Sequence, residues 1–294
     1  MSMRKLLVYA VGSNLLIAQE VAAVCRSLLG ELIEVHIATP ADMGTVKKEA
    51  LYVCAMMQAE ELRHIVPEEQ LCVFDLRPTA IFFLSVARAA KGERVAVLHN
   101  RVPYAQFLIE ECQRLGLDGP DFVPLGFEEQ TEEEVRAELA KARWLIGIGP
   151  FLEGDVVLGR YRDILPGEVQ VVAARRTASV RTACRFLVAG LELILERLQL
   201  ERFRYASEHN EVRLRELAAT VRCVAECVQK GAVQAVVNQL ETALPPAWEL
   251  PAIELPPPGT DFAELLVEVD EALWTLHYLK GKVEVMRAGK RVKD

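Results

Sequence analysis

The sequence predicts an α/β fold: two duplicated Rossmann-like lobes, each built on a parallel sheet, followed by a helical C-terminal region. Three observations support this prediction. Short apolar runs alternate with helical stretches up to residue 178. One half of this region repeats sequence features of the other. After Gly190 the apolar residues recur every three to four positions, which is the spacing of amphipathic helices.

The repeat is clearest in segments 13–25 and 100–112. In each, an Ala-Gln pair is followed, after five residues, by a cysteine, so that Cys25 and Cys112 are 87 positions apart. A second repeat matches Arg77-Pro78-Thr79-Ala80 with Arg175-Arg176-Thr177-Ala178, at an offset of 98. Internal repeats determine architecture, and this one predicts two similar lobes that face each other across a cleft.

Eight apolar runs are predicted to be parallel strands. Their consecutive positions are apolar, which is typical of strands covered on both faces, and the helical stretches between them predict right-handed βαβ crossovers. The runs are Leu6–Val11, Leu32–Ile37, Leu51–Ala55, Leu71–Phe74, Val95–Leu98, Phe122–Leu125, Trp144–Ile148 and Val169–Ala173.

The predicted strands divide the chain into three parts. Lobe one covers residues 1–90, and lobe two with a return helix covers 91–200. A helical annex follows over 201–294 and contains a proline-rich linker at 245–260, where helix cannot form. Segment 89–92 between the lobes is the predicted hinge.

The helical annex is predicted to hold several amphipathic helices. Ser207–Asn210 interrupts the apolar pattern, and Thr260-Asp261 caps a last helix that runs through Leu279, before a basic tail. Such helices are stable only when their apolar stripes are buried. Two alternatives follow: the annex associates with a second copy, which makes the protein a homo-oligomer, or it packs onto the α/β body of the same chain.

Composition narrows the class of protein. A net charge of −8 argues against a protein that uses most of its surface to bind the phosphates of nucleic acids. The seven cysteines are scattered through predicted helices and strands, which indicates buried thiols in a reducing compartment. We find neither a signal peptide nor an apolar run long enough to span a membrane, so we expect a cytoplasmic protein without membrane contact.

The loops after the strands are the expected ligand site, since helix N-termini and loop amides converge at the carboxyl ends of parallel strands. Arginines in the two Arg-x-Thr segments would offer forked donors to a carboxylate or phosphate. Alternatively, the hydroxyl and amide residues of these loops cap helices, and the arginines pair with surface acids. The caps would be Ser13, Asn14, Thr79, and Thr177 or Ser179. The loops are Gly12–Asn14, Met56–Gln58, Asp75–Thr79, His99–Arg101, Gly147–Pro150 and Arg175–Ser179.

Catalytic, metal and cofactor motifs do not emerge from the sequence. Gly147-x-Gly149 lacks the glycine spacing of a dinucleotide loop, and Gly289-Lys290-Arg291 lacks the preceding strand of a phosphate-binding loop. The repeated Cys25 and Cys112 fall inside helices and are predicted to be packing residues. Cys223 and Cys227 lack a second pair of metal ligands, and we therefore assign no catalytic residue, metal or cofactor.

The pattern resembles the N-terminal sensory domains of bacterial sigma-54-dependent transcriptional regulators of the propionate catabolism activator type. The resemblance covers residues 4–200 and is based on the two lobes, the Arg-x-Thr segments, Gly92–Leu98 and the helix that begins at Ser179. It implies a periplasmic-binding-like fold with a small effector between the lobes. The AAA+ ATPase and helix-turn-helix domains of that family are not recognisable in this chain.

Applied residue by residue, the resemblance implies nine ligand-binding residues. They are Ser13, Asn14, Arg77, Thr79, Asn100, Arg101, Arg175, Thr177 and Ser179.

The leading functional hypothesis is a non-catalytic sensor for signal transduction and transcription regulation. A small anionic metabolite would close the two lobes, and the helix from Ser179 would transmit this closure to the annex and to a partner in the transcription machinery. One alternative is an isomerase, lyase or transferase that uses the same cleft, with Asp75 and His99 as the best ionisable pair. The other is a scaffold protein whose helices carry the interaction.

Overall fold

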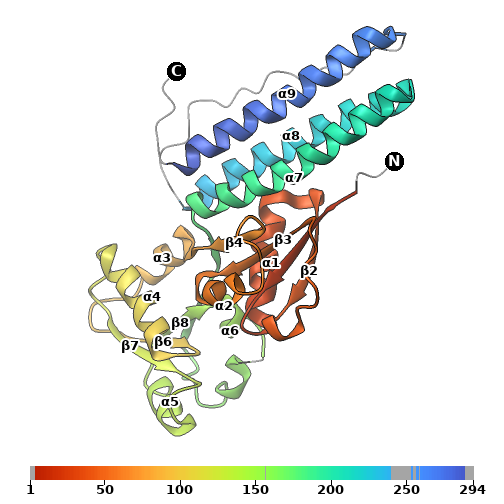
Figure 1. Cartoon of the computed structure of the whole chain (residues 1–294). Helices are drawn as coiled ribbons and strands as arrows, with labels where there is room; N and C mark the ends of the chain where they lie inside the picture. The colour runs from red at the N-terminus through yellow and green to blue at the C-terminus, as the bar shows by residue number, and fades with distance from the viewer. Residues whose placement is uncertain (1–3, 156, 240–252, 254–255, 258, 289–294) are drawn as a thin grey trace. The chain divides into compact units, whose positions relative to one another are not determined.

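The computed structural model describes residues 4–155, 157–239, 253, 256–257 and 259–288. The chain forms two compact units, and it passes from the first to the second and back again (Figure 1). The first unit comprises Met1–Leu76 and Ala178–Asp294, and the second comprises Arg77–Thr177.

The first unit contains a four-stranded parallel sheet with the order β2-β1-β3-β4. Alternate residues of a strand are buried in two different hydrophobic clusters, one on each face of the sheet. In β3, Leu51 and Val53 join the cluster that holds α1, whereas Tyr52 and Cys54 join the cluster that holds α2. Burial on both faces explains why these strands are continuous apolar runs. The elements are β1 (Leu6–Val11), α1 (Leu15–Leu29), β2 (Ile33–Ala38), β3 (Ala50–Ala55), α2 (Ala59–Arg63) and β4 (Leu71–Phe74).

The second unit has a parallel sheet of the same kind, with the order β7-β6-β8-β9. Counted along the chain, the strands of the two units therefore follow one topology, and all eight predicted strands are confirmed. The elements are α3 (Ala80–Val86), β6 (Arg94–His99), α4 (Val102–Arg114), β7 (Asp121–Gly126), α5 (Glu132–Leu139), β8 (Trp144–Ile148), α6 (Gly149–Leu152) and β9 (Gln170–Ala174).

The two crossings of the chain lie in short strands, β5 (Leu76–Pro78) and β10 (Arg176–Ala178), which pair with each other. The Thr79 N–H donates to the Arg175 carbonyl at 3.0 Å, and the Ser179 N–H donates to the Asp75 carbonyl at 2.8 Å. These bonds bracket an antiparallel pair. The repeated Arg-x-Thr segments thus form the two-stranded linker.

The unit boundaries differ from the predicted lobes. The prediction placed the first boundary at residues 90 and 91, with a hinge at 89–92, but both positions lie inside the second unit. Helix α3 accounts for the difference, because Phe82 and Val86 are buried in the core that also contains β6 and α4. Likewise, residues 178–200 were assigned to lobe two, whereas α7 (Val180–Ser207) is buried in the first unit.

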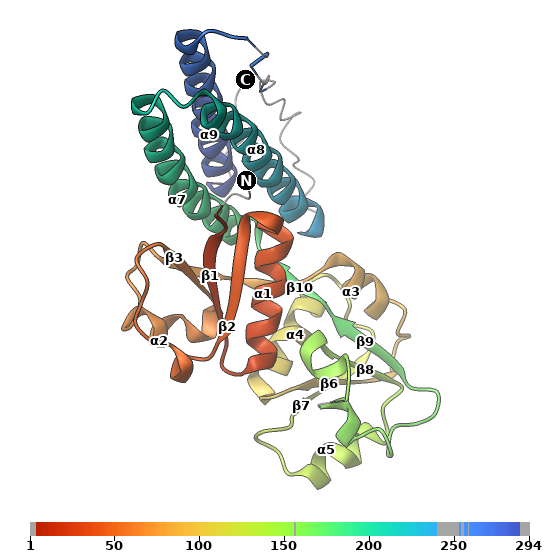
Figure 2. The same ribbon diagram turned by 90° about the vertical axis from the view of Figure 1, so that its right-hand side faces the viewer.

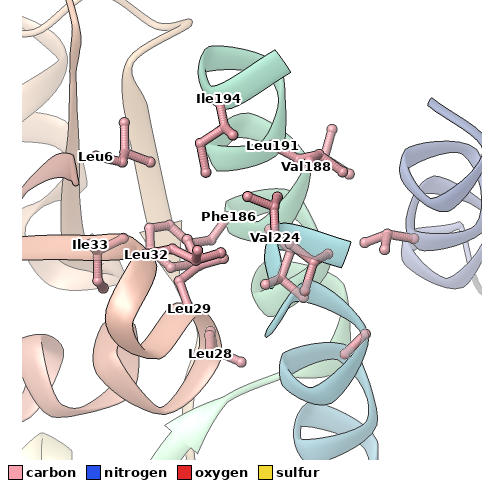
Figure 3. Close-up of a cluster of buried hydrophobic side chains, with 14 of the residues drawn as sticks. Leu6, Leu28, Leu29, Leu32, Ile33, Phe186, Val188, Leu191, Ile194 and Val224 are labelled. Carbon is pink, nitrogen blue, oxygen red and sulfur yellow. The ribbon is translucent and has the colours of Figure 1, made fainter. Parts of the chain in front are cut away.

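The helical annex packs onto the sheet of the first unit (Figure 2). Helices α7, α8 (Glu211–Gln239) and α9 (Phe262–Arg287) share one buried cluster with α1 and with β1 and β3. Leu28 and Leu29 of α1 point into this cluster beside α7 and α8 (Figure 3). Of the two alternatives, packing onto the same chain is therefore confirmed, and self-association is not needed to bury these stripes.

The ends of the annex helices match their predicted signals. The break at Ser207–Asn210 separates α7 from α8, and His209 adopts a positive φ of 51° there. Asp261 caps α9 by accepting hydrogen bonds from the backbone N–H groups of Ala263 and Glu264. Helix α9 runs to Arg287, beyond its predicted end. Most of the proline-rich linker lies outside the described residues, as do Leu240, Leu244 and the final six residues.

The cysteines were predicted to be buried, and five of the seven are. Burial raises the pKa of the Cys112 thiol to about 12, and it also raises the pKa of Cys25 well above its usual value. Both thiols are therefore neutral core groups, as predicted for the repeated pair. The prediction is wrong for Cys223, which is exposed, and for half-buried Cys227, because these residues lie along the outer side of α8.

No helix in the described ranges has both the length and the apolarity required to cross a bilayer.

We predict that Gly231→Ala weakens the contact between α8 and α1. A Cβ atom at this position would lie 1.9 Å from the Leu28 carbonyl oxygen, so the two backbones must move apart. We expect the free energy of unfolding to fall by about 1–3 kcal/mol in urea titrations followed by circular dichroism.

The control is Gly281→Ala on α9, where nothing lies within 4 Å of the added atom. It should leave stability unchanged or raise it by about 0.5–1 kcal/mol, since alanine is the better helix former. Equal stability of the two variants would contradict the close packing of α1 and α8.

Candidate functional site

His99 is the last residue of β6 and is buried among aromatic side chains of the second unit. Its exposed fraction is 8%. The imidazole packs edge-on against Tyr104 and Phe151, with ring centroids 5.1 and 5.2 Å away, and Phe127 in turn packs edge-on against Phe151 at 5.0 Å. Residues that follow three strands at the carboxyl edge of the sheet thus enclose one titratable group.

Asn100 provides the polar contacts of this histidine. Its Oδ1 lies 2.6 Å from Nδ1 of His99, and its Nδ2 donates to Glu128 Oε2 at 3.0 Å. The backbone N–H of Asn100 also donates to Nδ1 of His99 at 2.9 Å. Asn100 therefore contacts Nδ1 of His99 with both its backbone and its side chain, and a carboxylate orients that side chain.

The pKa of His99 is lowered to about 4. Burial is the largest cause, because it disfavours the charged imidazolium; the contact with Asn100 raises the pKa, and the positive charge of Arg176 lowers it further. The histidine is therefore neutral at pH 7. Such a weak base is poorly suited to general base catalysis, but it can accept or donate hydrogen bonds in a bound complex.

The loops around His99 are held together by short backbone contacts. Gly126 at the end of β7 has no room for a side chain, since a Cβ atom would lie 2.5 Å from the backbone N of Val102. Glu129 Oε2 accepts from the Val102 N–H at 2.9 Å, and Gln130 Oε1 accepts from the Gly126 N–H at 2.7 Å. A carboxylate thus already occupies the N-terminus of α4, where an anion could otherwise bind.

Six of the nine predicted ligand residues lie in the second unit: Arg77, Thr79, Asn100, Arg101, Arg175 and Thr177. Asn100 belongs to the His99 cluster. Thr177 is buried in β10, Arg77 is half-buried in β5, and Thr79 begins α3 without a capping bond from its side chain.

Two arginines of this set, Arg101 and Arg175, are exposed, whereas Arg176 is half-buried. Arg175 is 81% exposed, and its Nε donates to Glu153 Oε1 at 3.3 Å. Arg101 is exposed at the N-terminal boundary of α4. The alternative prediction, that arginines pair with surface acids, thus describes Arg175.

The other three predicted residues, Ser13, Asn14 and Ser179, lie in the first unit. Asn14 caps α1 by accepting from the Ile17 N–H at 3.0 Å, and Ser13 is exposed beside it. The Ser179 hydroxyl lies 3.0 Å from that of Thr182 at the start of α7. The capping alternative is therefore correct for Asn14, whereas the Ser179 side chain does not cap its helix.

Sequence reasoning missed most of the His99 cluster. His99 was the only histidine at a predicted strand end, and that position was the available signal for a role. Phe127 and Phe151 follow two other strands, so only the order of the sheet brings them to His99. Arg176 was the unassigned middle residue of an Arg-x-Thr segment, and its effect on the pKa of His99 depends on three-dimensional distance alone.

Among the described residues there is no group of three His, Cys, Asp or Glu side chains that could hold a metal ion. No family model, curated protein or solved structure matches the chain.

We predict that His99 stays neutral down to acidic pH. In the folded protein, the imidazole resonance in NMR spectra should titrate near pH 4 and not near the usual value of 6.5. Between these values the unfolded chain binds the proton and the folded protein does not. The free energy of unfolding should therefore fall by about 1.4 kcal/mol for each pH unit below 6.5.

The matched variant is His99→Gln, which cannot titrate. Between pH 7 and 5, the wild type should lose about 2 kcal/mol more stability than this variant. An imidazole that titrates near pH 6.5 in the folded protein would contradict the burial of this group.

Proposed function

We propose that the protein is a ligand-sensing regulatory protein, and that a small anionic metabolite binds at the carboxyl edge of the second sheet. The observation that carries this proposal is the position of Arg176. It acts electrostatically on buried His99, and it also lies in the linker strand β10, which leads through Ser179 into α7. One segment therefore joins the polar cluster to the helical region.

The chemistry of the cluster favours an anion. A guanidinium offers forked donors that match a carboxylate or phosphate. Asn100 and neutral His99 would add uncharged hydrogen bonds in partly buried surroundings, where each polar contact is stronger than in water. Glu128 and Glu129 lie on the same edge but are engaged by Asn100 and by the start of α4.

The linker is the proposed route of the signal. Strands β5 and β10 contain both crossings of the chain, so any change in the arrangement of the units must pass through them. The chain then enters α7, whose buried residues contact the first sheet and the other annex helices. Ligand binding would thus alter the annex by a hinge at the linker.

The regulatory output is proposed from the resemblance to sigma-54-dependent regulators. The shared strand order of the two sheets supports a duplicated, Rossmann-like and periplasmic-binding-like origin of the units. In this proposal the helical annex contacts a transcription-machinery partner in the cytoplasm. The enzyme alternative has less support, because burial raises the pKa of the Cys25 and Cys112 thiols, which disfavours thiolate nucleophiles, and lowers the pKa of His99 to about 4, which makes it a weak base.

We expect ligand binding to appear in a thermal-shift screen of small carboxylates and phosphate monoesters. At a hundredfold excess over its Kd, a ligand should add about 2.7 kcal/mol to the stability of the folded protein. Arg176→Met should weaken binding by about 10-fold to 100-fold in calorimetry, as expected for the loss of a hydrogen-bonded charge.

The control is Arg143→Met, because Arg143 immediately precedes β8 at the opposite edge of the sheet and pairs with Glu168 at 2.7 Å. It should bind like the wild type. The same ligand should change hydrogen exchange at the Thr79 and Ser179 amides, which flank the linker. Equal affinity of the two variants, or a screen without any hit, would refute the proposed site.

A further inference from the structure

Helix α9 has apolar residues on two opposite faces. One face is buried in the first unit through residues such as Leu265, Val269 and Leu276. On the other face, Val267 is 55% exposed and Trp274 is 61% exposed. Exposed apolar side chains that gather on one face of a helix are typical of surfaces that bind a partner. Among the residues that the structure describes, the bundle covers one side of α9 and leaves these two side chains exposed.

The outer face of α9 is defined here as Val267, Glu271, Trp274, Tyr278, Lys282 and Val285. The spacings of seven, four and seven residues between its apolar members place them in line, since seven residues make nearly two helical turns. They lie about half a turn from the buried residues. Two ion pairs with α7, Arg202–Asp270 and Lys280–Glu192, involve α9 residues outside this set.

The side chains in the middle of this face form an ordered stack. The rings of Trp274 and Tyr278 lie 5.8 Å apart with an interplanar angle of 21°. The Lys282 Nζ lies 5.1 Å from the centroid of the Tyr278 ring. Large aromatic groups that are exposed yet already ordered lose little conformational entropy on association, and tryptophan and tyrosine are enriched among residues that dominate binding energy.

The outer face of α9 is complementary to itself when its direction is reversed. Its acidic residue, Glu271, precedes the aromatic pair, and its basic residue, Lys282, follows it. In an antiparallel pair centred at residue 276, Trp274 of one copy meets Tyr278 of the other. Val267 then meets Val285, and Glu271 comes next to Lys282. A twofold interface requires this kind of self-complementarity.

We propose that the outer face of α9 binds the same face of a second copy of this chain, antiparallel about a twofold axis near residue 276. The buried stripes of the annex are satisfied within one chain, so this interface uses a surface separate from that core. It does not depend on the anion site, because its residues lie on α9 of the first unit and the His99 cluster lies in the second.

The first test measures the oligomeric state of the full chain by sedimentation velocity at micromolar concentrations. The wild type should sediment as a dimer, and Trp274→Glu as a monomer with an unchanged circular dichroism spectrum. Phe107→Glu is the control, since Phe107 is an aromatic residue that is 54% exposed on a helix of the second unit, and this variant should remain dimeric. A monomeric wild type, or a dimeric Trp274→Glu, would overturn the proposal.

The second test examines the antiparallel register by reversal of charge. Glu271→Lys places two lysines together at both ends of the interface and should weaken the dimer about tenfold or more. The double variant Glu271→Lys with Lys282→Glu restores opposite charges and should recover most of the wild-type affinity. Failure of the single variant to weaken the dimer, or of the double variant to recover it, would refute this register.

A third measurement uses disulfide formation in a Cys223→Ser background. Chains with Val267→Cys should cross-link to chains with Val285→Cys after mixing. Neither variant should cross-link with itself, because equivalent residues would be roughly 27 Å apart along the antiparallel helices. Self-linkage of Val267→Cys would instead indicate a parallel pair and overturn the proposal. Ligand affinity is expected to be the same in all of these variants.

Discussion

Burial of α7 between the sheet and the other annex helices is the packing constraint on which the first unit depends. Phe186 meets Phe74 of β4 edge-on at 5.5 Å, so the first half of the helix covers the sheet. Further along, Leu198 and Tyr205 are buried in the same cluster as residues of α8 and α9. The annex is therefore not an independent domain, and its apolar core is continuous with that of the α/β sheet.

This continuity gives α1 an unusual role for a helix in a parallel α/β unit. One side covers the sheet, as in any βαβ crossover, and the other side receives α8. The second contact is so close that Gly231 faces the Leu28 carbonyl without any intervening side chain. Leu29 meanwhile lies against Gly190 of α7. Small residues on two annex helices thus bring the backbones close together and exclude water from the shared core.

The second unit combines burial with polarity at its strand ends. A neutral histidine, an amide and a carboxylate are connected by hydrogen bonds, and Arg176 acts on the histidine electrostatically, so the edge of the sheet is polar without an unpaired buried charge on His99. The linker strand β10 contributes Arg176 to this edge and continues into α7. The same short segment therefore carries a charge that acts on His99 in one unit and leads into a helix that is buried in the other. For this reason we propose that ligand binding in the second unit is coupled to the helices of the first.

Local patterns predicted much of the fold. The eight strands, the cap at Asn14, the break near His209 and the cap at Asp261 all depend on neighbours in the sequence, and the structure has each of them. The unit boundaries were less predictable. A repeated sequence suggests a boundary between the copies. However, Phe82 and Val86 are buried in the core of the second unit, and the periodicity of the sequence does not identify the residues against which they pack.

The candidate site shows the same division. Sequence patterns located the strand-end loops and singled out the Arg-x-Thr segments, because strand ends and turn residues are local signals. Only the tertiary structure decided that these segments pair as the linker and that His99 is enclosed by Phe151. Those outcomes depend on contacts between residues far apart in the chain. The sequence by itself thus determined the secondary structure and its order, whereas long-range packing decided which surfaces meet and which groups lose contact with water.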